Sequence, residues 1–183
     1  MPKIVATKQD WIFLGYQRFS AQGIAGIVVE TMADKLKVNK SSFYWHFKTK
    51  KEFIDELIQF WITTETEQVI KQTEQAKSPK DKLESFLKIA FKNDPYLEFI
   101  FFLKRYAIKN KKVQLIIDEV DAKRLLFTST LFQELGYTQS EAEVKARLFY
   151  NYLIGYHEMI RNKKQPKDYL VQVKQDLKHF LNI

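Results

Sequence analysis

Apolar residues recur at helical spacing along most of the chain, and the stripes are separated by residues that favour helix ends. In the first stripe Ile12, Tyr16 and Phe19 share one helix face, and Gly23 follows as a C-terminal cap. The 183 residues include only five glycines and four prolines, which is little material for the turns of an all-β fold. The pattern therefore predicts an all-α fold of about nine helices.

Helix starts are predicted wherever an N-cap residue precedes an apolar stripe. Thr49 and Thr138 each stand three residues before a glutamate, as in a capping box, while Ser78 and Asp94 each precede a proline. Asn39 is the expected N-cap of a short helix. Residues 96–108 are apolar nearly all round, which predicts a buried central helix, and 113–135 predict a long helix that stops before a glycine.

Positive charge is concentrated at the start of the chain. Residues 1–52 hold nine Lys or Arg against four Asp or Glu, so this part carries +5 of the formal net charge of +8. Such a charge suggests an anionic partner, either a nucleic acid or a membrane surface. We expect two packed units, residues 1–52 and residues 53–183, joined by a helix that begins near Lys50.

Several classes of protein do not fit the sequence. No segment reaches the roughly 20 apolar residues of a membrane-spanning helix, no secretion signal opens the chain, and cysteine is absent, so we expect a cytoplasmic protein. His157-Glu158 lacks the second histidine of a zinc-binding H-E-x-x-H motif, and there is no G-x-S-x-G, P-loop or dinucleotide fingerprint. We expect no enzyme, no metal and no cofactor.

Residues 29–47 have the pattern of a helix-turn-helix, with a supporting helix, a short turn and a second helix whose outer face is polar. The apolar inner positions are Val29, Met32, Ala33, Leu36, Val38, Phe43 and Phe47. The outer positions are Lys40, Ser41, Ser42, Tyr44 and Trp45. Small hydroxyls and a lysine can approach base edges, and a tyrosine can donate to a phosphate oxygen, so this face predicts binding to duplex DNA.

Lys50 lies at the start of the next predicted helix. The free N–H groups and the positive end of the helix dipole favour a phosphate there, and the lysine adds charge to the same place. Two residues on the preceding helix have a second interpretation: Trp45 can be a packed or merely exposed aromatic, and His46 more often packs or hydrogen-bonds than titrates.

With these positions in view, residues 10–58 resemble the DNA-binding domain of the tetracycline-repressor (TetR) family. The run Phe43-Tyr44-Trp45-His46-Phe47-Lys48-Thr49-Lys50 is close to that family's signature, and the spacing of Phe19, Gly23, Met32-Ala33 and Val38-Asn39 is similar to it as well. The resemblance implies base or phosphate contacts and a phosphate clamp at Lys50. The residues that it implies as contacts are Lys40, Ser41, Ser42, Tyr44, Trp45 and His46.

Three positions depart from the family. Ile27 and Val28 stand where the family usually has Thr or Ser, so the second helix is expected to lack a hydroxyl cap and a phosphate contact. Lys37 replaces the usual turn glycine, which puts a side chain where a positive φ is often needed.

The resemblance further implies a repressor that a small-molecule effector releases from operator DNA. It also implies a homodimer that pairs through its last two helices, for which the stripes in 149–160 and 169–181 are the support in this sequence. Such a dimer would read a palindromic operator. The alternative from the residues alone is a basic helical protein that binds anionic membrane or a protein partner, with the aromatic run 99–102 as its best support.

Overall fold

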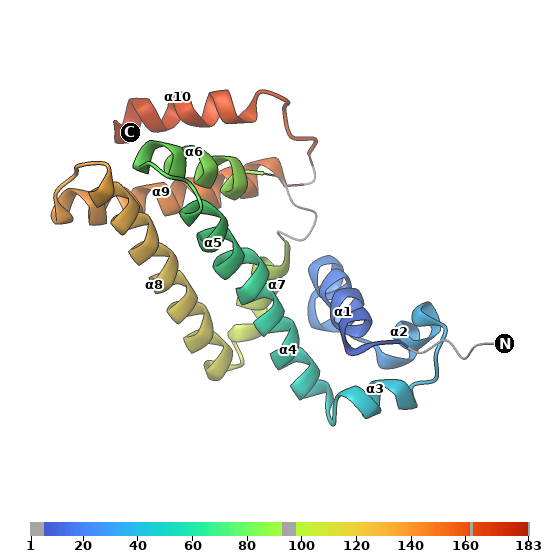
Figure 1. Cartoon of the computed structure of the whole chain (residues 1–183). Helices are drawn as coiled ribbons and strands as arrows, with labels where there is room; N and C mark the ends of the chain where they lie inside the picture. Colours follow the sequence, from blue (N-terminus) through green and yellow to red (C-terminus); the bar gives the residue numbers. More distant parts are fainter. Residues whose placement is uncertain (1–5, 93–97, 162, 183) are drawn as a thin grey trace. The chain divides into compact units, whose positions relative to one another are not determined.

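The computed structural model describes residues 6–92, 98–161 and 163–182, and these form helices without any strand (Figure 1), which confirms the all-α prediction. The first elements are α1 (Lys8–Gln22), the 3-10 turn η1 (Gly23–Gly26), α2 (Val29–Leu36) and α3 (Ser41–His46). Then come α4 (Lys50–Ile62), the π-helical segment η2 (Thr63–Glu67) and α5 (Gln68–Glu74), which run on as one helix. The last are α6 (Pro79–Ala90), α7 (Glu98–Ala107), α8 (Lys111–Glu134), α9 (Gln139–Ile160) and α10 (Tyr169–Leu181).

Most of the predicted caps are present. Thr138 and Glu141 make both hydrogen bonds of a capping box, and Ser78 accepts from the Asp81 N–H with Pro79 at the first position of α6. Gly23 caps α1 with φ 63° and ψ −148°, a positive-φ conformation that glycine adopts without a steric penalty. The cap expected at Asp94 lies outside the described residues.

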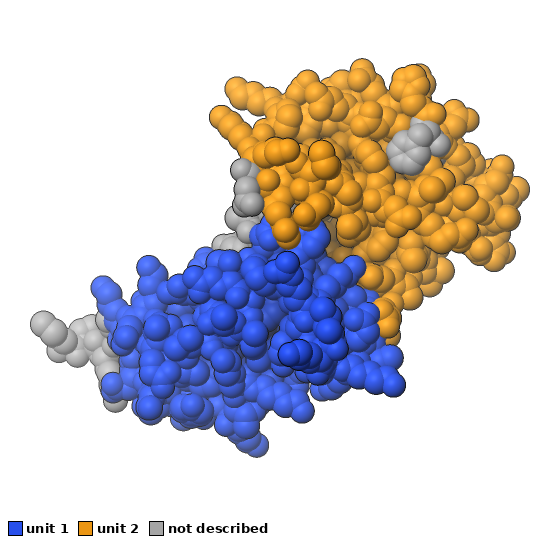
Figure 2. All heavy atoms as spheres, turned by 180° about the vertical axis from the view of Figure 1, so that it is seen from behind, with its two compact units in different colours: residues 1–64, 95–117 blue, residues 65–94, 118–183 orange. Residues whose placement is uncertain are grey.

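The chain divides into two compact units, shown in different colours in Figure 2. Unit 1 comprises Met1–Thr64 and Pro95–Ile117, and unit 2 comprises Glu65–Asp94 and Asp118–Ile183. The chain passes between the units three times: inside η2, between residues 94 and 95, and inside α8. The predicted division into functional parts at residue 52 stays a prediction. The compact unit 1 also contains residues 53–64 and 95–117, so its boundary does not test a boundary of function.

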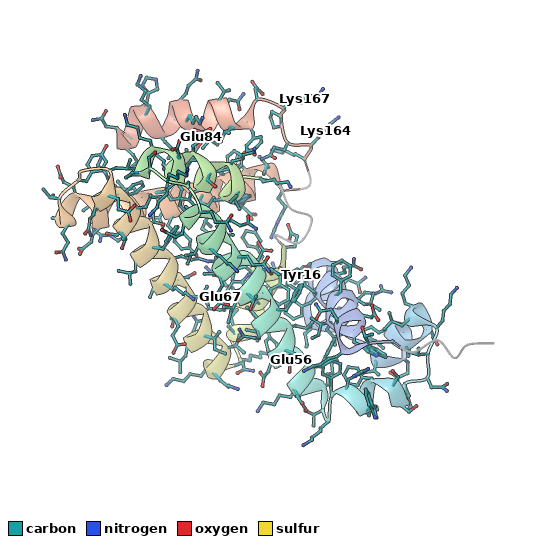
Figure 3. The ribbon with its side chains drawn as sticks, viewed as in Figure 1. Tyr16, Glu56, Glu67, Glu84, Lys164 and Lys167 are labelled. Atoms are coloured by element: carbon teal, nitrogen blue, oxygen red, sulfur yellow. The ribbon has the colours of Figure 1, made fainter. Side chains whose placement is uncertain are left out.

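Unit 1 is built around aromatic side chains. Phe43 and Phe53 are fully buried with ring centroids 5.1 Å apart, and Trp11 meets Phe43 edge-on at 5.3 Å. Gly15 lets α4 lie close to α1, because a Cβ there would stand 2.3 Å from the Phe53 ring. Glu56, labelled in Figure 3, forms an ion pair with Lys8 that joins the same two helices at the surface.

The helix α7 also belongs to unit 1, and within Glu98–Ala107 only Lys104 and Arg105 are exposed, so the predicted burial holds for its apolar side chains. Phe99 stacks on Tyr16 at 4.5 Å and lies 4.6 Å from the Phe19 ring, so α7 packs on α1 through one face. Ile108, just beyond its end, is 80% exposed. The aromatic run 99–102 therefore has its first ring in the protein core, which removes the main support for the membrane-binding alternative.

Unit 2 has its own apolar core. It is formed by buried side chains of α6, α8, α9 and α10, namely Phe86, Leu87, Phe91, Leu131, Phe132, Ala142, Ala146, Phe149, Val173, Leu177 and Leu181. Tyr152, Leu153 and Tyr156 pack against this core. The stripes expected to pair two chains are thus largely used inside one chain, which corrects the argument that they form the dimer face.

Beside this core lies a polar network that includes Tyr150. Its hydroxyl donates to Asp121 at 2.6 Å, and burial raises its pKa from 10 to about 12. Because the folded state favours the protonated hydroxyl, its contribution is complete below pH 10 and is lost as the pH rises through 12. The free energy of unfolding should then fall by about 2–3 kcal/mol between these values.

Urea unfolding of the wild type and of Tyr150→Phe at pH 9–12 measures this contribution. The variant should start from a lower stability, because it lacks the hydrogen bond to Asp121, and should show a shallower alkaline loss. Equal slopes for the two proteins would contradict the assignment, since the titration of surface lysines is common to both.

Candidate nucleic-acid interface

The turn between α2 and α3 depends on one residue in a left-handed conformation. Lys37 has φ 58° and ψ 40°, and its N–H donates to the carbonyls of Ala33 and Asp34 at the end of α2. The Val38 N–H also returns to the Ala33 carbonyl, at 3.0 Å. These bonds satisfy carbonyls that the helix end leaves free, and they reverse the chain toward α3. The positive φ expected at this position is confirmed.

Replacing Lys37 by glycine should stabilise the protein. A non-glycine residue in this conformation costs roughly 1–2 kcal/mol, part of which glycine loses again through its more flexible unfolded chain. We expect Lys37→Gly to raise the free energy of unfolding by about 0.5–1 kcal/mol in urea denaturation. Lys35→Gly, at an exposed position inside α2, is the matched control and should lower it by a similar amount. A destabilised Lys37→Gly would show that the left-handed turn is not strained.

The N-termini of α2 and α3 lack side-chain caps. Val28 caps α2 without a side-chain bond, as its apolar side chain predicts, while Ile27 is fully buried. The expected cap Asn39 is wrong: Lys40 occupies the N-cap of α3, also without a side-chain bond. Instead the Ser42 N–H donates to the Asn39 carbonyl at 2.9 Å, in a tight turn at the start of α3.

The inner side of α3 is fixed by buried rings and two hydrogen bonds. Phe43 and Phe47 are fully buried, as predicted. The Trp11 indole N–H donates to the Ser42 hydroxyl at 3.4 Å, and the His46 Nε2 lies 2.8 Å from the Ala6 carbonyl. Both partners come from the start of the chain, 31 and 40 residues away. Nothing in the local sequence pattern indicated either bond.

The predicted contact residues therefore fall into two groups. Lys40, Ser41, Tyr44 and Trp45 are exposed on the outer side of α3, whereas Ser42 and His46 are half-buried and engaged with α1 or the residues before it. Trp45 is 81% exposed and Tyr44 is 54% exposed. Two neighbouring large aromatic side chains are seldom this exposed to solvent unless they contact a binding partner. This face of α3 is therefore a candidate binding surface.

Lys50 lies beside this surface, at the first position of α4, where its side chain is exposed. The Thr49 hydroxyl accepts from the Glu52 N–H at 3.1 Å, as expected for half of a capping box. The Glu52 carboxylate accepts from the Lys48 N–H rather than from Thr49, so the second half is shifted by one residue. The remaining free N–H groups of α4 and the Lys50 ammonium offer an anion site.

The charges on this surface allow Lys40 to leave its weak ion pair with Glu30 and bind a phosphate instead. Lys40 lies 3.6 Å from Glu30, and both side chains are 64% exposed, so the pair contributes less than about 1 kcal/mol. Lys48, Lys50 and Lys51 form a second exposed positive cluster around the start of α4. The interface thus combines a weakly ion-paired lysine, hydroxyl groups, two exposed aromatic rings and an exposed lysine cluster.

The part of the chain that the structure describes also bears on metal binding and on membrane spanning. There, no three His, Cys, Asp or Glu side chains are grouped so that they could hold a metal ion. Of the helices described, none combines the length and apolar character needed to cross a bilayer.

Comparison with known proteins points to one family. Residues 15–57 match the family described as bacterial regulatory proteins, tetR family. The HTH-type transcriptional repressor KstR2 of Mycolicibacterium smegmatis is 25% identical over 128 residues, which are 68% of this chain and 54% of that protein. The match therefore spans about half the length of that relative.

Solved structures share the fold over almost the whole chain. A transcriptional regulator from Rhodococcus sp. Rha1 superposes with a TM-score of 0.71 at 16% identity, covering 95% of this chain and 97% of that one. The ketosteroid transcriptional regulator KstR2 of Mycobacterium tuberculosis gives a TM-score of 0.67 at 15% identity, covering 98% and 97%. At these identities the likeness shows the fold.

Proposed function

We propose that this chain is a sequence-specific DNA-binding transcriptional regulator that acts as a repressor, because residues 15–57 match the family of bacterial regulatory proteins described as tetR. The observation that carries the proposal is the outer face of α3, where exposed polar and aromatic side chains stand on a helix anchored by buried Phe43 and Phe47. Its setting is the cytoplasm, where bacterial operator DNA lies.

Each residue has a proposed role that follows from its exposure. Lys40 and Ser41 reach base edges in the major groove, Tyr44 donates to a phosphate oxygen, and Trp45 contacts a thymine methyl or the sugar-phosphate backbone. Ser42 and His46 contact DNA through the part of each side chain that is exposed, while their hydrogen bonds hold α3 in position. Lys50 clamps a phosphate at the N-terminus of α4.

Two substitutions test the roles of base reader and phosphate clamp. Lys40→Ala should reduce the preference for operator over random duplex, and Lys50→Ala should weaken binding to all sequences and make the salt slope shallower by about one. Fluorescence anisotropy at several salt concentrations measures both effects.

Lys164→Ala, a loss of the same charge at an exposed position of unit 2 (Figure 3), is the control and should leave both quantities unchanged. A wild type without steep salt-dependent DNA binding would overturn the proposed function. If both variants bound DNA as the wild type does, only the assignment of the contact face would be wrong.

We further propose that the chain acts as a homodimer through α9 and α10. The support is the set of exposed apolar side chains on these helices, Val144, Leu148, Met159 and Val171. A two-fold dimer would read a palindromic operator with half-sites about 34 Å apart or at a multiple of this spacing. Sedimentation equilibrium of the full chain should give the mass of two chains.

The proposed control of the repressor is a small-molecule effector that binds unit 2. Such a ligand must bind the operator-bound and free states with different affinity, because otherwise it cannot shift the equilibrium between them.

A further inference from the structure

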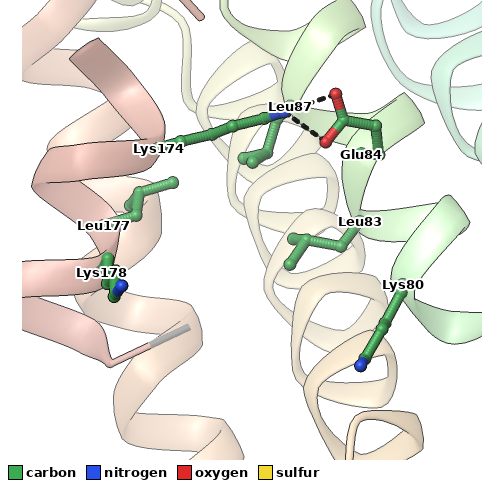
Figure 4. Close-up of a pocket in the computed structure, with 7 residues that line it drawn as sticks. All are labelled: Lys80, Leu83, Glu84, Leu87, Lys174, Leu177 and Lys178. Atoms are coloured by element: carbon green, nitrogen blue, oxygen red, sulfur yellow. Dashed lines mark hydrogen bonds and ion pairs between the residues drawn. The ribbon is translucent and has the colours of Figure 1, made fainter. Parts of the chain in front are cut away.

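A groove of about 240 Å³ separates α6 from α10 in unit 2 (Figure 4). Its floor is apolar: Leu87 and Leu177 are 4% and 1% exposed members of the unit 2 core, and Leu83 packs against the same core. Water above such a floor has few hydrogen-bond partners, so an apolar group that replaces it gains free energy.

The rim of the groove carries three lysines and one glutamate. Glu84 and Lys174 form an ion pair at 2.5 Å that joins α6 to α10 across one end, so the single acidic charge is already matched. Figure 4 shows Lys80 and Lys178 on opposite walls at the other end. Within the described residues, neither of these two lysines has an ion-pair partner. The groove therefore has an apolar floor, a closed end and two unmatched positive charges at the open end.

The sequence places these groups on facing sides of two helices. The α6 residues 80, 83, 84 and 87 follow the i, i+3, i+4, i+7 spacing of one helix face, and the α10 residues 174, 177 and 178 repeat i, i+3, i+4. Lysines at the borders of an apolar stripe commonly cover it with their own methylene groups. Here the two stripes face each other instead and leave space between them.

We propose that this groove binds a small aliphatic carboxylate. The carboxylate lies between Lys80 and Lys178, and its tail extends over Leu83 and the methylene groups of the lining lysines toward the ion-paired end. The volume equals that of about eight water molecules at roughly 30 Å³ each, which fits a chain of six to eight or so carbons. An inorganic anion would leave the exposed part of Leu83 in contact with water, and a neutral or cationic amphiphile would leave the two lysines unmatched.

The carboxylate is also the effector class of the repressor, and this part of the inference rests on the proposed function. By linkage, a ligand that lowers operator affinity must itself bind more weakly to the operator-bound protein. Ligand binding and DNA binding are therefore measured separately on the same full-length protein.

Octanoate is the probe for the binding experiment. Ligand-observed NMR suits it, because a ligand of this size held by exposed lysines should bind with a dissociation constant on the order of 1 mM. We expect octanamide to bind at least about tenfold more weakly, since it lacks the charge-assisted hydrogen bonds. The double variant Lys80→Gln/Lys178→Gln should weaken octanoate about tenfold as well.

Two further variants test whether octanoate binding depends on the groove itself rather than on the overall charge of the protein. Lys88→Gln/Lys167→Gln removes the same charge at exposed positions outside the groove and should bind octanoate as the wild type does. Leu83→Trp fills the groove without a change in charge and should abolish octanoate binding. Octanoate affinity that is unchanged in the Lys80/Lys178 variant, or equal affinity for octanamide, would overturn the proposed site.

Operator titrations of the same proteins test the regulatory part. Octanoate should lower operator affinity for the wild type and for the Lys88/Lys167 control but not for the groove variants. Octanoate that binds in the groove and leaves operator affinity unchanged would overturn its role as effector. Failure of the ligand-free wild type to bind DNA at all would overturn the proposed function and leave the carboxylate site standing.

Discussion

Phe43→Ala is expected to lower the free energy of unfolding by about 3–5 kcal/mol and to abolish operator binding near physiological temperature. Phe43 is fully buried and lies at the centre of an aromatic cluster, with Trp11, Phe47 and Phe53 all within 5.3 Å between ring centroids. Removing the ring leaves a cavity that these large, rigid neighbours cannot fill. Urea denaturation and DNA anisotropy on the same samples measure the two effects.

Trp45→Ala, two residues further along α3, is the matched control. This ring is 81% exposed, so its loss should change stability by less than about 0.5 kcal/mol while it weakens DNA binding. A Trp45 variant that loses stability as strongly as the Phe43 variant would show that α3 packs differently. A Phe43 variant with wild-type stability would contradict the aromatic core of unit 1.

Arg124→Met is the second substitution for which we expect a large effect, a loss of about 3 kcal/mol concentrated in unit 2. The Arg124 Nε donates to the buried Thr66 hydroxyl at 2.9 Å, and Nη2 donates to the Glu65 carbonyl at 3.1 Å. Nη1 also lies 3.4 Å from the Tyr150 hydroxyl. Methionine fills similar space but leaves these oxygens without their donor, and each such group costs about 1–3 kcal/mol.

The effect of this substitution should be localised at η2. A π-helical segment interrupts the regular hydrogen-bond ladder of a helix, and Arg124 binds its backbone from the side. Hydrogen exchange should therefore speed up most in residues 63–70 of the variant. The control is Lys123→Met, which removes an exposed ion pair with Glu67 at 3.2 Å and should cost less than about 1 kcal/mol. Equal losses in the two variants would contradict a special role for Arg124.

Local signals in the sequence predicted most helices and their ends well. Capping at Ser78 and Thr138, the stop before Gly136 and the stripe Val29–Leu36 each depend on residues within one or two helical turns. The positive φ of Lys37 also depends on local signals, because the tight turn that ends α2 requires a residue in the left-handed conformation. The outer face of α3 was predictable for the same reason, since a helix fixes which side chains share a face.

Contacts between distant segments could not be predicted in this way. The placement of α7 against α1, the bonds of Ser42 and His46 to residues near the start of the chain, and the pinning of η2 by Arg124 all join segments more than 30 residues apart. An apolar stripe shows that a helix has a partner, but it carries no information about which one. The stripes of α9 and α10 illustrate this, because from the pattern alone they predicted a dimer face, whereas the structure uses them largely in the core of unit 2.

The sequence by itself thus determined the all-α class, the sites where helices begin and end, and the polar face of α3, because backbone propensities and helical periodicity act locally. Only the tertiary structure decided which predicted contact residues stay open and which are held against α1, and how the leucines and lysines of α6 and α10 come to line one groove. These features depend on which helix faces pack against each other in the folded chain. Burial of apolar surface stabilises many such pairings, because it is non-directional, so the sequence pattern alone does not select one.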